Sequence, residues 1–216
     1  MFTCGSAMVC APRKFRGVYG SVLQSQIGHE RVFSVINRSD LTLCILAGGA
    51  GRRLGGRAKG LLTADGVTFI EKLLQLRAFC RDALVVSNDP AYDRFGVRRI
   101  EDVVPGKGAP GGVVTALLAA STPWILAVAC DMPFVTARAV QRLVDAGGAH
   151  DVSCYEREPL LAIYRTSLGA RWRARLDGNP SLQTLVAEQS PLTLIPDDAA
   201  TLESINTIDQ LAKVKS

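Results

Sequence analysis

The chain has only two histidines and lacks both a long hydrophobic run and any fibrous repeat. An apolar run such as residues 124–130 is far shorter than the ~20 residues of a membrane-spanning helix, so we expect no membrane-spanning segment and no membrane partner. Gly-X-Y periods and heptad runs are also missing, while aliphatic residues are plentiful. Collagen-like, coiled-coil and disordered classes are therefore excluded, and 216 residues fit one main globular domain.

Metal-binding cysteine motifs are lacking as well. The chain has six cysteines, but none forms a C-x-x-C and no pair of histidines accompanies them, so neither a zinc site nor a haem site is predicted. Cys44 and Cys130 lie inside apolar runs typical of buried strands. We therefore expect reduced, buried thiols and a cytoplasmic protein.

The excess of positive charge is concentrated in the first third of the chain. The net charge of +5 divides into +3 for residues 1–40, +3 for residues 41–66 and −1 for the remainder. The second of these segments is a short glycine-rich stretch. Such a placement favours a small anionic ligand over a long nucleic-acid track, so no nucleic-acid partner is expected.

From Leu41 onward, strand-like and helix-like segments alternate, which predicts an α/β fold of three layers, Rossmann-like, with a mostly parallel sheet. Residues 1–40 show no sustained period and are expected to be a disordered N-terminal extension, so the domain is assigned to residues 41–216. Strands are predicted at residues 41–46, 83–86, 97–100, 124–130, 151–155, 160–164 and 192–195. Helices are predicted at residues 68–80, 112–120, 136–146, 167–176 and 182–188, with a C-terminal helix capped by Thr207 and Gln210.

Polar and glycine-rich loops follow four of the predicted strands. Ligands of open parallel sheets bind beyond the carboxyl ends of the strands, so these loops should converge on one crevice. Their suggestive residues are the glycine-rich run 46–59, Asn88-Asp89, Glu101-Asp102 and Cys130-Asp131-Met132-Pro133.

The glycine-rich run fits neither familiar phosphate-binding motif. A P-loop needs Gly-Lys-Ser/Thr, but Lys59 is preceded by alanine and followed by glycine. A dinucleotide fingerprint that starts at Gly49 needs glycine at position 54, where leucine stands. The run predicts instead a loop whose backbone amides approach a phosphate chain, with Arg52, Arg53 and Lys59 reaching different phosphates. The alternative is a tight turn with solvated basic residues.

A family resemblance begins in this loop, in the run Leu-Ala-Gly-Gly-x-Gly-Arg-Arg-Leu-Gly-Gly-x-x-Lys-Gly. It resembles the motif of the molybdenum cofactor guanylyltransferases, which transfer GMP from GTP to molybdopterin. The likeness spans about residues 41–216 in the same order. It continues through Ile100-Glu101-Asp102, Gly108-Ala109-Pro110-Gly111-Gly112, Cys130-Asp131-Met132-Pro133, Glu158-Pro159-Leu160-Leu161-Ala162-Ile163-Tyr164 and Asn206-Thr207.

The resemblance implies a nucleotidyltransferase domain, roles for individual residues and a set of partners. The implied partners are GTP, molybdopterin and molybdoenzyme maturation proteins, and the implied cofactor is Mg²⁺, held by Asp131. The implied catalytic residues are Asp131, Lys59 and Arg53. The implied substrate-binding residues are Leu46, Ala47, Gly48, Gly49, Lys59, Asn88, Asp102, Asp131 and Asn206.

Other interpretations of these residues remain open from the sequence. Asp131 could cap the next helix, although Thr136 is better placed to do so, and Asp102 could be a solvated loop acid. Where the family often has Asn-x-Asn, this chain has Ser204-Ile205-Asn206. The alternative functions are a cytidylyl- or sugar-phosphate nucleotidyltransferase and a non-catalytic nucleotide-binding regulator. No histidine is expected in the crevice, which suits a nucleophile that is already anionic, such as a terminal phosphate.

Overall fold

The structure, a computed structural model, describes residues 35–48, 58–207 and 210. Among these residues, seven strands form one sheet in the order β5-β4-β1-β6-β8-β7-β9. Every neighbouring pair is parallel except those made by β8, which runs antiparallel to β6 and β7. The strands are β1 (Leu41–Leu46), β4 (Asp82–Val86), β5 (Arg98–Ile100), β6 (Trp124–Ala129), β7 (Val152–Tyr155), β8 (Glu158–Arg165) and β9 (Leu192–Leu194).

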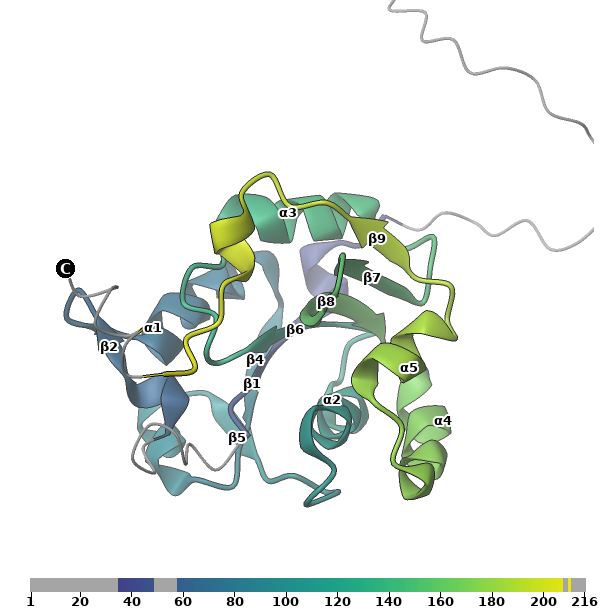
Figure 1. Cartoon of the computed structure of the whole chain (residues 1–216), viewed down its shortest axis with the longest axis horizontal. Helices are drawn as coiled ribbons and strands as arrows, with labels where there is room; N and C mark the ends of the chain where they lie inside the picture. The colour runs from purple at the N-terminus through teal and green to yellow at the C-terminus, as the bar shows by residue number, and fades with distance from the viewer. Residues whose placement is uncertain (1–34, 49–57, 208–209, 211–216) are drawn as a thin grey trace, which may run out of the picture. The chain divides into compact units, whose positions relative to one another are not determined.

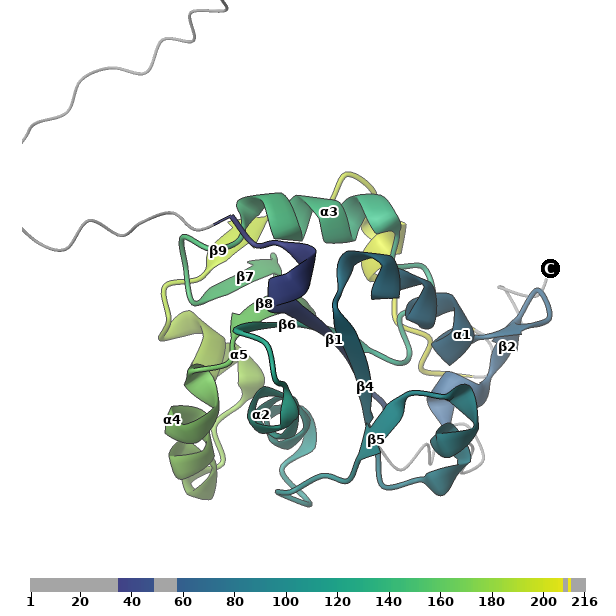
Figure 2. The ribbon, with the colours of Figure 1, turned by 180° about the vertical axis from the view of Figure 1, so that it is seen from behind.

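Helices cover both faces of the sheet, as Figures 1 and 2 show from opposite sides. One face packs on α1 (Phe69–Leu74) and α3 (Ala137–Ala146), and the other on α2 (Gly108–Ala119), α4 (Leu168–Arg175) and α5 (Leu182–Ala187). The predicted three-layer α/β fold with a mostly parallel sheet is confirmed.

The central strand β1 is buried along its whole length, which explains its unbroken apolar sequence. Leu41, Leu43 and Ile45 belong to the core on the α1 and α3 face. Cys44 and Leu46 belong to the core on the α2, α4 and α5 face. Because successive side chains of a strand point to opposite faces, β1 contributes to both cores and fixes the position of the loop that follows it.

The packed domain starts earlier than the predicted residue 41. Residues Arg38–Asp40 form a 3₁₀ helix that leads directly into β1. Ile36 is only 3% exposed and packs against Gly147 at the end of α3. The Arg38 Nε donates a hydrogen bond to the Cys80 carbonyl at 2.9 Å. Residues 36–40 therefore belong to the domain, and the expectation of disorder for the rest of the extension lies outside the described residues.

Two local features differ from the sequence prediction. Helix α2 begins at Gly108, four residues before the predicted start, and carries Pro110 in its first turn, where no amide hydrogen is needed. A hairpin of β2 (Thr63–Ala64) and β3 (Val67–Thr68) was not predicted. Its turn residues Asp65 and Gly66 both have positive φ, as an Asp-Gly turn allows.

Other predictions of local structure are confirmed. Thr136 caps α3 by accepting a hydrogen bond from the Ala139 N–H at 3.2 Å, so the helix does not use Asp131 as its cap. Thr207 and Gln210 bond each other reciprocally, as in a capping box. None of the helices in the described part of the chain has the length and apolar character to cross a membrane.

Candidate functional site

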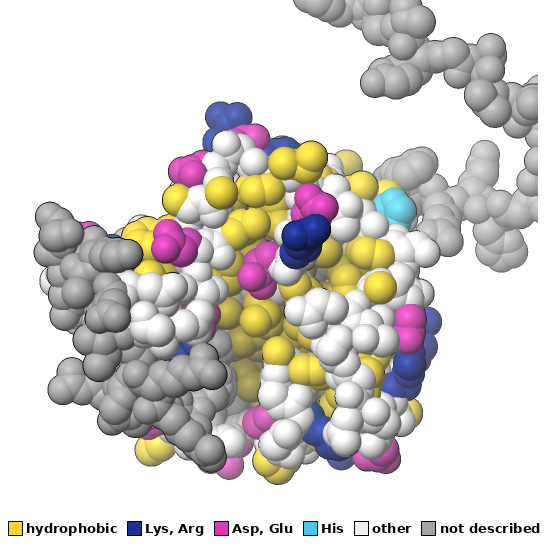
Figure 3. All heavy atoms as spheres, in the orientation of Figure 1, with side chains coloured by type: hydrophobic (Ala, Val, Ile, Leu, Met, Phe, Trp, Pro, Cys, Tyr) yellow, Lys and Arg dark blue, Asp and Glu magenta, His cyan; other side chains and the backbone are white. Residues whose placement is uncertain are grey.

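A pocket of about 610 Å³ lies at the carboxyl ends of the parallel strands, where the loops after β1, β4, β5 and β6 meet; we call it the carboxyl-end pocket. Figure 3 shows a hollow in this face of the molecule with hydrophobic side chains along its floor. Its described lining residues are Leu46, Gly48, Lys59, Val86, Ser87, Asn88, Asp102, Gly106, Gly108, Ala109, Gly112, Ala129, Cys130, Asp131 and Leu160.

The predicted convergence of the loops is therefore seen in the structure. Of the predicted residues, Leu46, Gly48, Lys59, Asn88, Asp102 and Asp131 line the pocket. Ala47 is buried in the core on the α1 and α3 face, between the lining residues Leu46 and Gly48, and Asn206 contacts the lining residue Lys59. Gly49 and Arg53 lie outside the described residues.

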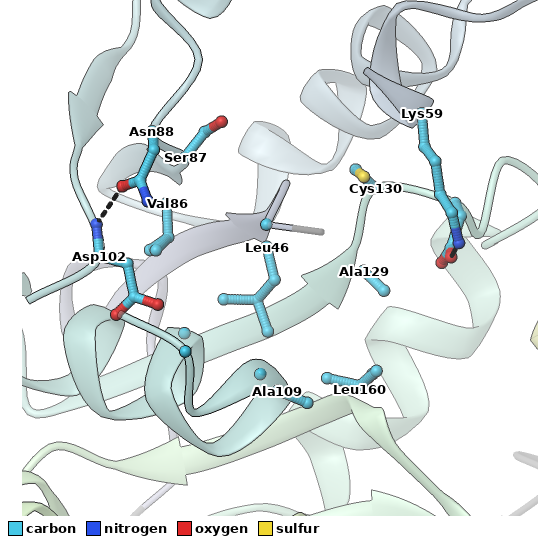
Figure 4. Close-up of a pocket in the computed structure, with 15 residues that line it drawn as sticks. Leu46, Lys59, Val86, Ser87, Asn88, Asp102, Ala109, Ala129, Cys130 and Leu160 are labelled. Atoms are coloured by element: carbon cyan, nitrogen blue, oxygen red, sulfur yellow. Dashed lines mark hydrogen bonds and ion pairs between the residues drawn. The ribbon is translucent and has the colours of Figure 1, made fainter. Parts of the chain in front are cut away.

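Apolar strand ends separate two polar sides of the pocket. Figure 4 shows Leu46, Ala129 and Leu160 between Asn88 and Asp102 on one side and Lys59 on the other. An apolar floor suits the face of a flat heterocycle, and the polar groups at its two sides suit groups of different charge. The pocket therefore has the form expected for a ligand with an aromatic part and an anionic part.

On the first side, Asn88 and Asp102 are joined directly. The Asn88 Oδ1 accepts a hydrogen bond from the Asp102 backbone N–H at 2.8 Å (Figure 4). This bond fixes the rotation of the carboxamide, because Oδ1 is engaged and Nδ2 becomes the outward donor. Nδ2 has no hydrogen-bond partner among the described residues. The side chain thus offers an N–H donor to a ligand.

The loop that carries Asn88 is held by Arg99 on β5. The Arg99 Nη1 donates to the Ser87 carbonyl at 2.9 Å, and its Nε donates to Asp93 at 2.7 Å. Asp93 raises the pKa of the Arg99 guanidinium further, so the side chain stays charged at any physiological pH. A planar guanidinium can hold several acceptors at once, which gives this loop a defined position.

On the second side, Lys59 is placed between two oxygen acceptors. Its Nζ donates to the Asp131 Oδ2 at 2.8 Å and to the Asn206 Oδ1 at 2.5 Å. The two charged side chains are partly exposed, at 24% for Lys59 and 17% for Asp131. The segment bearing Asn206 is anchored here as well, since the Ile205 N–H donates to the Asp131 carbonyl at 2.8 Å. Residues 147 positions apart thus meet at one point.

Lys59 owes its position to the glycine that follows it. Gly60 donates its N–H to the Tyr92 hydroxyl at 3.2 Å. A Cβ on Gly60 would lie 2.8 Å from that hydroxyl and 3.3 Å from the Cβ of Cys130, so only glycine fits without displacement. Burial raises the pKa of the Cys130 thiol to about 12, which keeps it protonated at neutral pH. Cys130 is only 4% exposed where it lines the pocket and belongs to the hydrophobic core, so we assign it a packing role.

Glu158, at the start of β8, adds a second carboxyl group near Asp131. Burial raises its pKa, and the negative charge of Asp131 raises it further, while the hydrogen bond from the Leu160 N–H opposes the rise. Glu158 stands in one of the runs that carry the family resemblance. The rule for parallel strands does not place it here, because β8 runs antiparallel to β6 and brings its amino end to this edge of the sheet.

The backbone after β1 is largely occupied by the fold itself. The Ala47 N–H donates to the Val86 carbonyl at 2.9 Å, and the Leu46 carbonyl accepts from the Cys130 N–H at 3.0 Å. The Ala47 carbonyl accepts from the Ser87 hydroxyl at 3.3 Å. Gly48 makes no hydrogen bond with the described residues. Among Leu46, Ala47 and Gly48, only Gly48 has both its N–H and its carbonyl without a partner among the described residues, so both are open to a ligand.

Comparison with known proteins agrees with this geometry. The MobA-like NTP transferase domain matches residues 43–192. A molybdenum cofactor guanylyltransferase of Cupriavidus metallidurans is 32% identical over 193 residues, which cover 82% of this chain and 95% of that protein. A molybdenum cofactor guanylyltransferase of Ralstonia nicotianae is 30% identical over 200 residues, covering 83% of this chain and 98% of that protein.

Solved structures share the fold. Molybdopterin-guanine dinucleotide biosynthesis protein A from Archaeoglobus fulgidus superposes with a TM-score of 0.67 at 24% identity, covering 81% of this chain and 96% of that chain. A 2-C-methyl-D-erythritol 4-phosphate cytidylyltransferase from Thermus thermophilus superposes with a TM-score of 0.61 at 17% identity, covering 80% and 96%. On the family match and the identity to near-full-length relatives, the chain belongs to the MobA-like NTP transferase family.

Proposed function

We propose that the protein transfers GMP from GTP to molybdenum-bound molybdopterin, forming the guanine dinucleotide form of the cofactor and releasing pyrophosphate. The observation that carries this proposal is the identity of about 30% to relatives named molybdenum cofactor guanylyltransferase, which align over 95–98% of their own length. The carboxyl-end pocket supports it by offering an apolar floor between one side that carries Asn88 and Asp102 and another that carries Lys59 and Asp131.

The polar groups suggest how GTP lies in the pocket. Asn88 and the backbone of Gly48 would face the guanine edge, which carries both donors and acceptors. Lys59 would face the phosphates and offset the charge that develops on the leaving pyrophosphate. Asn206 already accepts a hydrogen bond from the Lys59 ammonium and would help to orient it. Arg53 is proposed as a second phosphate contact on the strength of the sequence alone.

Asp131 is the proposed ligand for Mg²⁺. Its Oδ1 accepts no hydrogen bond from the described residues, whereas Oδ2 faces Lys59. No cluster of three or more histidine, cysteine or acidic side chains fit to hold a metal occurs in the described ranges. One carboxylate fits Mg²⁺, because this ion is usually bound through one or two carboxylates together with substrate phosphates and water. When bound, Mg²⁺ would supply charge neutralisation at the phosphates.

The reaction needs no histidine base from this chain. His150 is the one histidine in the part of the chain that the structure describes, and it faces the Ser190 carbonyl just before the amino end of β7, away from the carboxyl-end pocket. A terminal phosphate of molybdopterin is already anionic at neutral pH and can attack without losing a proton. The proposed work of the protein is therefore orientation and charge compensation.

The experiment is a nucleotide panel. Purified protein, Mg²⁺ and molybdopterin are mixed with each of the four nucleoside triphosphates, and pyrophosphate release is measured. We predict that kcat/KM for GTP exceeds that for ATP or CTP by at least about a hundredfold, since buried polar groups left unpaired by a wrong base give strong discrimination. Equal use of CTP would instead indicate a cytidylyltransferase. Nucleotide binding without pyrophosphate release from any nucleotide would indicate a regulator.

The cellular setting is proposed to be the cytoplasm, with molybdoenzyme maturation proteins receiving the product. The support for a reducing compartment is that Cys44, Cys80, Cys130 and Cys154 are all free and buried. Burial also raises the pKa of each of these thiols, so none is activated for disulfide exchange.

A further inference from the structure

One face of α2 packs against the loop that bears Asp102. Gly111 and Thr115 lie one helical turn apart on this face, at the i, i+4 spacing that brings side chains above one another. A Cβ on Gly111 would lie 2.9 Å from the Val104 carbonyl oxygen and 3.4 Å from the Asp102 Oδ2. Gly111 therefore allows the loop to approach the helix, and Thr115 meets it one turn later.

The Thr115 hydroxyl is fully engaged by this loop. It donates to the Asp102 Oδ1 at 2.9 Å and accepts from the Val103 N–H at 3.1 Å. The Asp102 Oδ1 also accepts from the Val104 N–H at 2.9 Å. Thr115 is 1% exposed, so water cannot replace the hydroxyl if it is removed. The geometry of the loop thus depends on one buried oxygen atom.

These bonds make the two oxygens of Asp102 unequal. Oδ1 is held by Thr115 and Val104, whereas Oδ2 accepts no hydrogen bond from the described residues. Asp102 lines the carboxyl-end pocket, and its backbone N–H fixes the Asn88 carboxamide. A change at Thr115 would consequently reach both polar groups on this side of the pocket.

We propose that Thr115 is a positioning residue for nucleotide recognition, which holds Asp102 so that Oδ2 accepts a hydrogen bond from a donor of the bound nucleoside. The proposal rests on the proposed use of GTP. A carboxylate oxygen accepts but cannot donate, so its partner must be an N–H or O–H group. Guanine offers N1–H and the 2-amino group, and the ribose offers its 2′- and 3′-hydroxyls.

The test compares three variants of the full-length protein. Thr115→Val removes the hydroxyl and keeps the shape, Thr115→Ser keeps the hydroxyl, and Thr122→Val is a matched control. Thr122 is also buried, and its hydroxyl bonds the Thr42 hydroxyl and the Trp124 carbonyl, each at 2.7 Å, just before the amino end of β6. It thus loses similar bonds at the end of the sheet opposite the pocket.

We expect Thr115→Val to weaken GTP binding about tenfold, measured by calorimetry, and to raise KM by a similar factor while kcat stays near wild type. Thr115→Ser, which keeps the hydroxyl, should bind GTP about as tightly as the wild type does. Thr122→Val should lower the melting temperature without changing KM. In an Asp102→Asn background, Thr115→Val should have little further effect, because the two residues act through one contact.

Analogues identify the donor that Asp102 receives. ITP lacks the 2-amino group, and 2′-deoxy-GTP and 3′-deoxy-GTP each lack one hydroxyl. If Oδ2 accepts from one of these groups, the wild type discriminates against the corresponding analogue and Thr115→Val loses that discrimination. If N1–H is the donor, the wild type discriminates against N1-methyl-GTP instead, and Thr115→Val loses that discrimination.

Two outcomes overturn the proposal. In the first, Thr115→Val binds GTP as tightly as the wild type does. In the second, Thr115→Val loses no more GTP affinity than Thr122→Val does, and the ratio of its affinity for GTP to its affinity for each analogue equals that of the wild type. Failure of the proposed function looks different, because the wild type itself would then prefer another nucleotide or release no pyrophosphate.

Discussion

At the scale of single residues, the site is organised around the contact between Lys59 and Asp131. Opposite charges 2.8 Å apart and only partly exposed hold each other in place, and Asn206 completes the arrangement. A partly solvated ion pair of this kind adds little to folding stability. Substitutions of Lys59 or Asp131 are therefore expected to lower the activity more than the stability.

For Asp131, we predict that Asp131→Asn abolishes turnover while leaving the melting temperature close to that of the wild type. The amide keeps the size of the side chain but removes the charge proposed to bind Mg²⁺ and the partner of Lys59. Pyrophosphate release over a titration of Mg²⁺ checks the first part, and thermal unfolding checks the second. Near-normal activity at limiting Mg²⁺ would show that Asp131 is not the ligand.

For Lys59, we predict that Lys59→Ala weakens binding of GTP much more than binding of guanosine, because its proposed partners are phosphates. The sequence predicts the same behaviour for Arg53→Ala. Calorimetry with both ligands measures the difference. Lys72→Ala is a suitable control, since Lys72 pairs with the exposed Asp65 rather than with the pocket. An equal loss for both ligands would mean that Lys59 supports the loop or contacts the base.

At the scale of elements, the sequence predicts correctly those features that periodicity and topology determine. The strand at residues 41–46 was predicted to the residue, because both of its faces are buried and its apolar run is unbroken. The convergence of Asn88, Asp102 and Asp131 followed from the rule that parallel strands end at one edge. Neither prediction required knowledge of any individual long-range contact.

Elements whose structure depends on a long-range contact are not predictable from local preference. The start of α2 was missed because glycine and proline in residues 108–112 are typical of loops, whereas the packing of Gly111 on Val104 favours a helix there. Thr115 and Tyr92 gave no sequence signal, since their importance depends on partners from other elements. The Asp-Gly pair at residues 65–66 was a usable signal for the β2–β3 hairpin.

The 3₁₀ helix Lys59–Leu61 docks on the 3₁₀ helix Pro90–Phe95 through a glycine. We predict that Gly60→Ala lowers the free energy of unfolding by about 1–3 kcal/mol, because the new methyl group would press on Tyr92 and Cys130. It should also raise KM for GTP by displacing Lys59. Urea unfolding and steady-state kinetics measure the two effects.

Gly178→Ala is the matched control for this substitution. No atom lies within 4 Å of a Cβ at Gly178, so stability should not fall and KM for GTP should not rise. A Gly60→Ala protein as stable and active as this control would show that the two 3₁₀ helices can move apart freely, and that the glycine does not set the position of Lys59.

At the scale of the whole molecule, the two cores on either side of the sheet determine where the domain begins. The core on the α1 and α3 face includes Ile36 together with Leu41, Leu143 and Trp124. Ile36 is thus part of the same packed cluster as the central strand, although it precedes that strand by five positions. The pattern of residues 36–40 has too few apolar positions for a sequence to reveal this.

Two truncations that differ by six residues test the domain start. Residues 1–34 show no sustained apolar period, so a protein without them should match the melting temperature and kcat/KM of the full chain. Deleting residues 1–40 also removes Ile36 and the Arg38 bond to Cys80, and we expect a loss of about 2–5 kcal/mol of stability, the range for truncating a buried isoleucine. Ile36→Ala in the full chain should reproduce most of this loss. Equal unfolding midpoints for both truncations in urea would mean that Ile36 contributes nothing and that the domain starts at Leu41.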